Sequence, residues 1–332
     1  MKRKLKIALM SLVLIPCLLL LSACSASTSK YADKLATASE KYFFNHGSVH
    51  QKDLTITTKS EGKRTYNESV QYNESASRTE SFEEVSESTE TIEIDAVQNE
   101  ENTYINYIRI TRSYKNTLDG FKANEAKTGL EAFTKVTENN SVYTLVKDNE
   151  TYKCYVDIQV KVDGVVDETA TKKSVYSFND LVEYSTYVKT LTNTINDKLI
   201  VSTFYDSFDN YKLLGAEVNR YTNFGKFGTK VEYSGMELDV DNDLDMYEYA
   251  FNHGTMKFKN TLKKSGPVKA TYELESYDFG SLSDVSKINT KVEKELKVSY
   301  KDVSISVPTG FEDIAAVDGN PSISFSRFLS ID

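Results

Sequence analysis

Apolar and polar residues alternate along most of this 332-residue chain. In the segment "TYKCYVDIQVKVDG", the positions that share the parity of Tyr152 and Cys154 are apolar as far as Val162, whereas Lys153 and Asp157 stand between them. This period of two is typical of a β-strand with one buried face. Only 14 glycines and 4 prolines interrupt the chain, while tyrosine is abundant with 22 residues. A folded, strand-rich protein is therefore expected rather than a disordered stalk.

Further alternating segments predict further strands. They lie at residues 53–59, 64–72, 89–97, 103–115, 141–148, 268–276 and 302–308. In the last of these, Val303, Ile305 and Val307 share one parity and Pro308 ends the segment. The dipeptide Asp163-Gly164 separates two alternating stretches and predicts a hairpin turn.

Three segments show the spacing of amphipathic helices instead. They are residues 30–45, a short stretch at 129–139, and residues 177–197, whose apolar stripe is Leu181, Tyr184, Val188, Leu191 and Ile195. Ser177 with Asp180 three positions later predicts a capping box at the start of the third helix. The order of helices and strands predicts an α+β, mostly β fold: a curved antiparallel sheet with a few helices on its concave face.

The first residues form a leader. Four basic residues between Lys2 and Lys6 precede an apolar run from Ile7 to Leu21, which is short for a spanning helix because about 20 apolar residues are needed to cross a bilayer. The run ends on Leu21-Ser22-Ala23-Cys24, which resembles the lipobox of bacterial lipoproteins. The resemblance implies cleavage before Cys24, directed by Leu21, Ser22 and Ala23, and attachment of diacylglycerol to the Cys24 thiol. An ordinary secretory signal that happens to contain cysteine is the alternative.

This assignment divides the chain into a signal peptide (1–23), a polar tether (24–30) and a β-rich ectodomain (31–332), with a possible split into 31–172 and 173–332. Cleavage removes Cys17 and lipidation uses Cys24, so Cys154 is left without a partner for a disulfide. Its parity predicts a buried, unreactive thiol. Without the four basic residues of the leader, 36 basic residues face 49 acidic ones, a net charge of −13. That charge argues against nucleic acid as a partner.

The whole layout resembles the LolA-like half-barrel lipoproteins, a group that includes uncharacterised surface lipoproteins of Gram-positive bacteria. The resemblance rests on the lipobox, the tether, the helix at 30–45 and strands that end in "VSISVPTGF". It implies a sheet wrapped around helices, with an apolar cavity that binds a lipid or another apolar ligand. A carrier would line that cavity with the helical stripe from Leu181 to Ile195.

Three other features are weighed as sites. The start of a calcium loop is resembled by four aspartates: Asp239, Asp241, Asp243 and Asp245. Leu244 stands where a calcium loop of the EF-hand type needs glycine, so an exposed acidic turn is favoured, with a looser calcium site as the alternative. The acidic run from Glu80 to Asp95 contains no basic residue. We interpret it as a solvated strand face that blocks pairing at a sheet edge, with cation binding as the alternative.

The tetrapeptide Phe-Asn-His-Gly occurs at 44–47 and again at 251–254. A duplication would make two related halves, but the first copy ends a predicted helix and the second continues a predicted strand, which favours coincidence. The two copies contain His46 and His253, and a zinc site with His50 is not favoured because the spacing is not that of a metal site.

No nucleophile-elbow motif and no cofactor motif is found, and we expect no enzymatic activity and no cofactor; a hydrolase with an unrecognised site ranks last among the function classes. The leading hypothesis is a lipoprotein on the extracytoplasmic face of the bacterial cell membrane, anchored through the lipid on Cys24, that binds a lipid or apolar ligand. The alternative is an envelope-structural or protein-interaction lipoprotein with a filled core. Its protein partner is not identified by the sequence.

Overall fold

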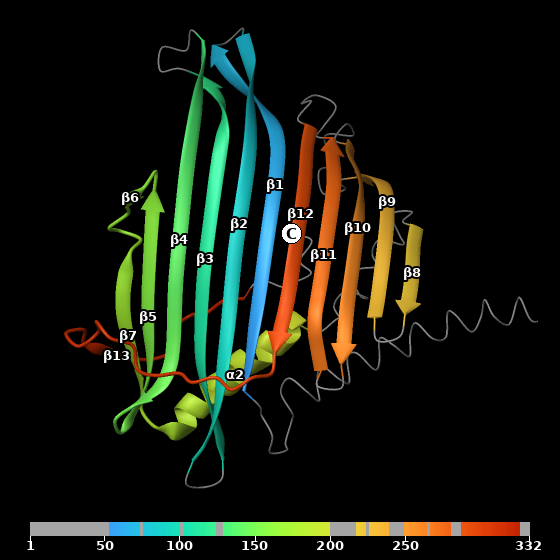
Figure 1. The fold of residues 1–332 in the computed structure, drawn as a ribbon. Coiled ribbons are helices and arrows are strands. Elements are labelled where there is room, and N and C mark those ends of the chain that lie inside the picture. Colours follow the sequence, from blue (N-terminus) through green and yellow to red (C-terminus); the bar gives the residue numbers. More distant parts are fainter. Residues whose placement is uncertain are drawn as a thin grey trace, which may run out of the picture.

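The computed structural model describes residues 53–73, 76–99, 103–123, 129–199, 217–223, 226–238, 249–263, 266–279 and 287–325. These residues form one extended β-sheet and one helix, α2 (Leu181–Leu199), as Figure 1 shows. In this described part of the chain, no helix combines the length and the apolar character needed to cross a membrane.

Thirteen strands form the described sheet, in the spatial order β13-β7-β5-β4-β3-β2-β1-β12-β11-β10-β9-β8, with β6 paired to β5 off this path. The strands are β1 (Leu54–Asn73), β2 (Ala76–Gln98), β3 (Tyr104–Ala123), β4 (Leu130–Asp148), β5 (Thr151–Val162), β6 (Val165–Val166), β7 (Lys172–Phe178), β8 (Glu217–Asn223), β9 (Lys226–Leu238), β10 (Tyr249–Lys263), β11 (Gly266–Phe279), β12 (Lys287–Ser299) and β13 (Ala316–Asp318). Neighbouring strands are antiparallel except β13 and β7, which are parallel.

Two antiparallel meanders meet in the middle of this sheet. The first runs outward from β1 to β7, and the second returns from β8 at the far edge to β12. They join where residues 55–65 of β1 pair with residues 289–299 of β12. The sheet therefore takes strands from both sides of the possible boundary at 172/173, and β7 itself begins at Lys172.

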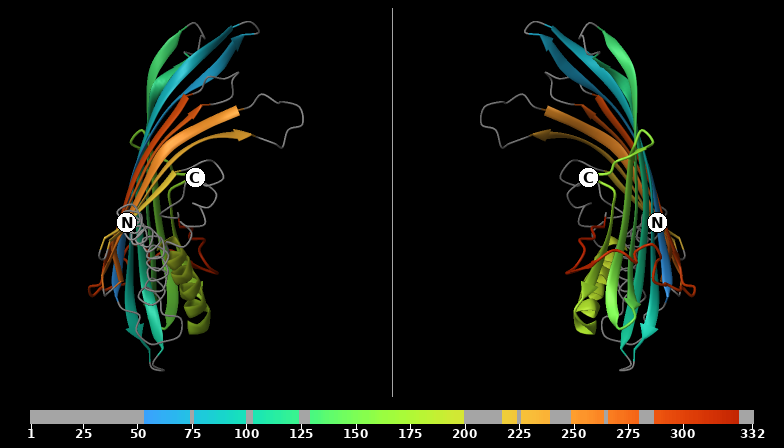
Figure 2. Two further views of the ribbon diagram at one scale, coloured as in Figure 1. Left: turned by 90° about the vertical axis from the view of Figure 1, so that its right-hand side faces the viewer. Right: turned by 90° about the vertical axis from the view of Figure 1, so that its left-hand side faces the viewer.

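The sheet has two distinct faces. Its strands bend toward the side that carries α2 (Figure 2), and we refer to this side as the inner face and to the opposite side as the outer face. Because side chains alternate along a strand, one row across five strands lies wholly on the inner face. That row pairs Leu54, Ile94, Ile108, Leu145 and Cys154, all of them at most 2% exposed.

The predicted apolar stripe of α2 covers this row. Tyr184, Val188, Leu191 and Ile195 are between 0 and 5% exposed and belong to the same core cluster as the inner-face strands. Burial of each such side chain contributes about 1.5–3 kcal/mol relative to exposure. The core predicted from strand alternation and from the helical stripe is thus confirmed, including the burial of Cys154.

The predicted α+β fold with a few helices on the concave face is wrong for the described residues, which contain one helix only. The predicted helix at 30–45 lies outside them. Residues 129–139 are not a helix, because they begin β4 and pair with the long strand β3. The three-residue spacing of Leu130, Phe133 and Val136 suits a strand with two half-buried faces equally well, so cross-strand pairing decides the structure.

The start of α2 also differs from the prediction. Ser177 belongs to β7, and Asp180 is the N-cap residue, because its Oδ1 accepts the backbone N–H of Glu183 at 2.8 Å. The Glu183 carboxylate accepts in turn the backbone N–H of Asn179 at 2.8 Å. The predicted capping box is therefore displaced by three residues, since the acid nearest the helix acts as the cap.

Residues 302–308 do not form the predicted strand. They belong to a segment of residues 300–325 that we name the C-terminal strap. This strap crosses the lower part of the sheet in Figure 1. Its backbone N–H groups at Val303 and Ile305 donate to the carboxylates of Asp53 (2.9 Å) and Asp95 (3.1 Å) on the outer face. Side-chain carboxylates thus replace the neighbouring strand that the alternation had predicted.

The turn predicted at Asp163-Gly164 is confirmed. It connects β5 to β6, and both residues have positive φ, 51° and 79°. Positive φ at both central residues is the requirement of a type I′ hairpin turn, which glycine and aspartate tolerate.

Candidate functional site

Many of the residues that the sequence singled out as sites lie outside the described part of the structure. This holds for Leu21, Ser22, Ala23 and Cys24, for the candidate calcium residues 239–245, and for His46 and His50. The second Phe-Asn-His-Gly copy lies within β10, as its strand context predicted. Within the described ranges, no three or more His, Cys, Asp or Glu side chains are placed so that they could hold a metal ion.

Aromatic side chains fill the contact between α2 and the sheet at Tyr184. The ring of Tyr184 is fully buried, stacks on Tyr152 with centroids 4.7 Å apart and meets Phe178 edge-on at 5.2 Å. Its hydroxyl donates to the backbone carbonyl of Asn106 at 3.1 Å. The described part of α2 therefore rests directly on the sheet.

Cys154 is fully buried in this interface, so its thiol is not accessible to reagents. Burial raises the pKa of its thiol well above the usual range, because the thiolate would lose its solvation. The thiol therefore stays protonated and unreactive at neutral pH, as its parity predicted.

The acidic run from Glu80 to Asp95 lies on β2, which is a central strand between β1 and β3. The interpretation as protection of a sheet edge is therefore wrong. Basic residues of a neighbouring strand pair with part of the run instead: Arg109 binds Glu93 at 2.6 Å and Arg112 binds Glu90 at 2.8 Å. Both arginines lie on β3, which follows β2 along the chain and pairs with it. Aligning these two segments as a hairpin would have predicted the ion pairs from the sequence.

Strand register also aligns glutamates that are far apart in the sequence. On the outer face, Glu273, Glu293, Glu61 and Glu87 lie directly opposite one another on β11, β12, β1 and β2. Like charges in direct cross-strand pairs are destabilising. Lysine side chains offset part of this repulsion, as where Lys291 binds Glu293 at 2.7 Å.

A shallow polar groove lies beside this glutamate row and has a volume of about 330 Å³. Its lining comes from β1 to β4: Lys59, Ser60, Glu61, Glu87, Ser88, Thr89, Ser113, Tyr114, Lys115, Glu138 and Asn140. The lining contains hydroxyl, amide, ammonium and carboxylate groups but no imidazole or thiol, so it suits hydrogen bonding to a polar surface rather than nucleophilic chemistry.

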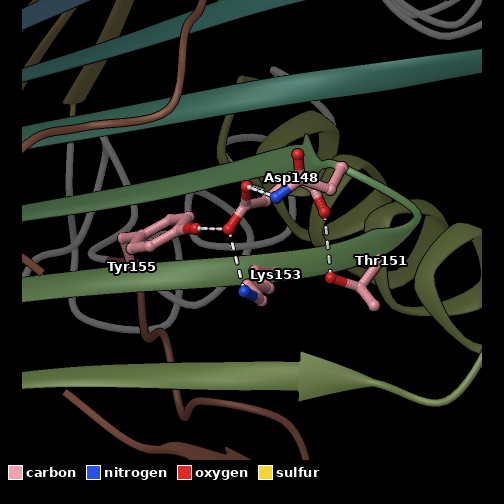
Figure 3. A network of polar contacts seen from close by, with 5 residues as sticks. Asp148, Thr151, Lys153 and Tyr155 are labelled. Carbon is pink, nitrogen blue, oxygen red and sulfur yellow. Dashed lines mark hydrogen bonds and ion pairs between the residues drawn. The ribbon is translucent and has the colours of Figure 1, made fainter. Parts of the chain in front are cut away.

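A second polar network fixes the outer face next to the strap (Figure 3). At the β4–β5 turn, the Asp148 carboxylate accepts hydrogen bonds from Lys153 Nζ (2.8 Å) and from the Tyr155 hydroxyl. These two donors lower the pKa of Asp148 below its usual range, the lysine having the larger effect. The Tyr155 ring meets Phe311 of the strap edge-on at 5.2 Å. The network therefore orients the ring on which the strap rests.

The Asp95 carboxyl, which accepts the Ile305 N–H of the strap, has a shifted pKa. The neighbouring residues Leu54 and Ile94 pair directly, which places Asp53 opposite Asp95. The pKa of Asp95 is raised, first by burial and also by the negative charge of Asp53, although the hydrogen bond from Ile305 opposes this shift. Because the pKa of Asp95 is higher in the folded chain than in the unfolded chain, its contribution to folding stability is fully present below the unfolded-state pKa. That contribution is lost as the pH rises through the folded-state pKa.

We expect Asp95→Asn to be as stable as the wild type at pH 7 or more stable, by less than about 1 kcal/mol because the side chain is partly exposed. The amide oxygen still accepts the Ile305 N–H, while the charge beside Asp53 is gone. Urea unfolding at pH 3 and pH 7 measures the effect, and the difference between variant and wild type should shrink at pH 3. A loss of stability at pH 7 that disappears at pH 3 would show instead that the charged acceptor outweighs the repulsion.

Comparison with known proteins gives no family. No family model matches the chain, and no curated protein matches it. Among solved structures, the transport unit of the autotransporter AIDA-I from Escherichia coli aligns with a TM-score of 0.21 and 9% identity over 82% of this chain and 98% of that chain. The translocator domain of the autotransporter NalP from Neisseria meningitidis aligns with a TM-score of 0.16 and 9% identity over 83% and 97%. TM-scores this low do not establish a shared fold, so neither protein informs the function.

Proposed function

We propose that the chain is a bacterial lipoprotein on the extracytoplasmic face of the cell membrane, anchored through a lipid on Cys24, whose ectodomain is a non-enzymatic structural or protein-interaction module. One observation carries the choice of module over carrier: four residues of α2 are packed against the sheet and are at most 5% exposed, namely Tyr184, Val188, Leu191 and Ile195. The groove on the opposite face is polar. Both features suit a protein that presents surfaces rather than one that encloses an apolar ligand.

The anchor is supported by the residues of the leader and by the charge of the chain. An acidic ectodomain is repelled by anionic lipid, so membrane attachment must come from covalent lipid. Two acyl chains suffice for stable anchoring, since each buried methylene adds about 0.8 kcal/mol.

Cys24→Ala is expected to abolish incorporation of fatty acid and to release the chain from the membrane fraction. In the experiment, the full-length chain is labelled with an alkyne fatty acid in a bacterial host, and the mass of its N-terminal peptide is measured by mass spectrometry. Cys17→Ala is the matched control, because it changes the other leader cysteine and should leave both lipidation and cleavage before Cys24 intact. Label retained in Cys24→Ala would reject the anchor.

The module is tested separately from the anchor. Native mass spectrometry of the wild-type chain purified from host membranes should show the covalent lipid alone. A further lipid bound without a covalent bond at one copy per chain would favour the carrier hypothesis instead.

A further inference from the structure

On one side of the sheet, the second strand from the end is β7, a strand of seven residues. The edge of β7 that faces away from β5 is covered by the short parallel strand β13. In this pairing, Ala316, Val317 and Asp318 lie opposite Val175, Tyr176 and Ser177. All three β13 residues are exposed, and Val317 is 57% exposed. The cover thus adds little packing of its own.

Two different features protect this edge from pairing with another strand. At its beginning, β7 carries two exposed lysines, Lys172 and Lys173, which are typical of protected edges. At the apolar half from Val175 to Ser177, protection comes from β13. Without the strap, this half would expose an unpaired strand edge.

Contacts on both faces hold β13 in place. Before it, Phe311 packs on Tyr155, and Lys173 Nζ lies 5.0 Å from the centre of the Phe311 ring. After it, the Tyr187 hydroxyl donates to the Pro321 carbonyl at 2.6 Å on the inner face. Arg112 Nη2 donates to the Ser324 carbonyl, also at 2.6 Å. The strap therefore passes around the β7 edge and is anchored on each side of it.

We propose that the β7 edge is a pairing surface for β7 of a second copy of this chain, and that the C-terminal strap keeps it closed. An antiparallel pair centred on Val175 would place Lys172 opposite Phe178 and Lys173 opposite Ser177, so no like charges would face one another. Such a pair would extend both sheets over seven residues, against the three that β13 covers. The inference goes beyond the proposed function and does not depend on the lipid at Cys24.

Val317→Pro tests the closure, because proline removes the N–H of the central β13 residue while the exposed side chain contributes little. Val317→Thr is the matched control, since threonine keeps the N–H and the β-branched shape. With the full-length chain in detergent, we expect amides 175–177 of Val317→Pro to exchange hydrogen about five- to tenfold faster at low concentration, as for one lost ladder hydrogen bond. Sedimentation should show a dimer that increases with concentration, whereas wild type and Val317→Thr stay monomeric.

Phe311→Ala loosens the same strap without changing the backbone of β13 and should also produce the dimer. The proposal is overturned if both variants exchange faster at 175–177 yet stay monomeric. It is equally overturned if neither variant changes exchange at these amides, or if the wild type dimerises as strongly as Val317→Pro.

Discussion

Tyr184→Ala is expected to lower the free energy of unfolding by about 3–5 kcal/mol, the range for truncating a large buried aromatic side chain. The ring is fully buried at the centre of the contact between α2 and the sheet, where it touches Tyr152 and Phe178. Its removal leaves a cavity and also leaves the Asn106 carbonyl without the tyrosine hydroxyl. Urea unfolding followed by circular dichroism measures the loss as a lower midpoint at unchanged slope.

Two variants separate the parts of this effect. Tyr184→Phe keeps the ring and loses only the hydrogen bond to Asn106, so it should cost about 1–2 kcal/mol. Val182→Ala changes a residue of the same helix that is 72% exposed and should stay within about 0.5 kcal/mol of the wild type. If Tyr184→Ala cost no more than Val182→Ala, α2 would not rest on the sheet, and the filled core that favours a structural or interaction module would be lost.

Gly120→Ala is expected to destabilise the protein by about 1–3 kcal/mol, the usual cost of overpacking, although alanine is less disfavoured than glycine in a strand. A Cβ atom at Gly120 would lie 2.4 Å from the backbone oxygen of Ser81 and 2.9 Å from the Phe82 ring. The rings of Phe82 and Phe133, whose residues both pair with Gly120 from opposite sides, meet edge-on at 5.8 Å. Alanine must therefore shift backbone or separate the two rings.

Gly62→Ala is the matched control on β1. A Cβ there would meet only the hydroxyl of Ser86, at 2.6 Å, and that side chain can rotate away. Because alanine restricts the unfolded chain, we expect Gly62→Ala to range from neutral to about 1 kcal/mol more stable. Thermal unfolding of both variants compares them, and equal losses would contradict the close approach at Gly120.

The local sequence pattern correctly predicted the strand and the helix in which the apolar repeat continues over many residues. The alternation around Cys154 and the stripe from Tyr184 to Ile195 each identified a buried face, and both faces meet in the core. The pattern misled where one spacing suits two structures: Leu130, Phe133 and Val136 repeat every three residues but stand in a strand. It also misled at Val303 and Ile305, whose alternation is real but whose backbone partners are carboxylates.

The sequence by itself determined the strand-rich class, a helix predicted at 177–197 that the structure places at 181–199, the burial of Cys154 and the prediction of an anchor at Cys24, because each depends on residues close together in the chain. Only the tertiary structure decided what depends on register and on long-range contact. It placed the acidic strand β2 at the centre opposite Arg109 and Arg112, and it brought the strap around the β7 edge. A shift of one residue would reverse every side chain of a strand, and no local pattern specifies which distant strand lies opposite.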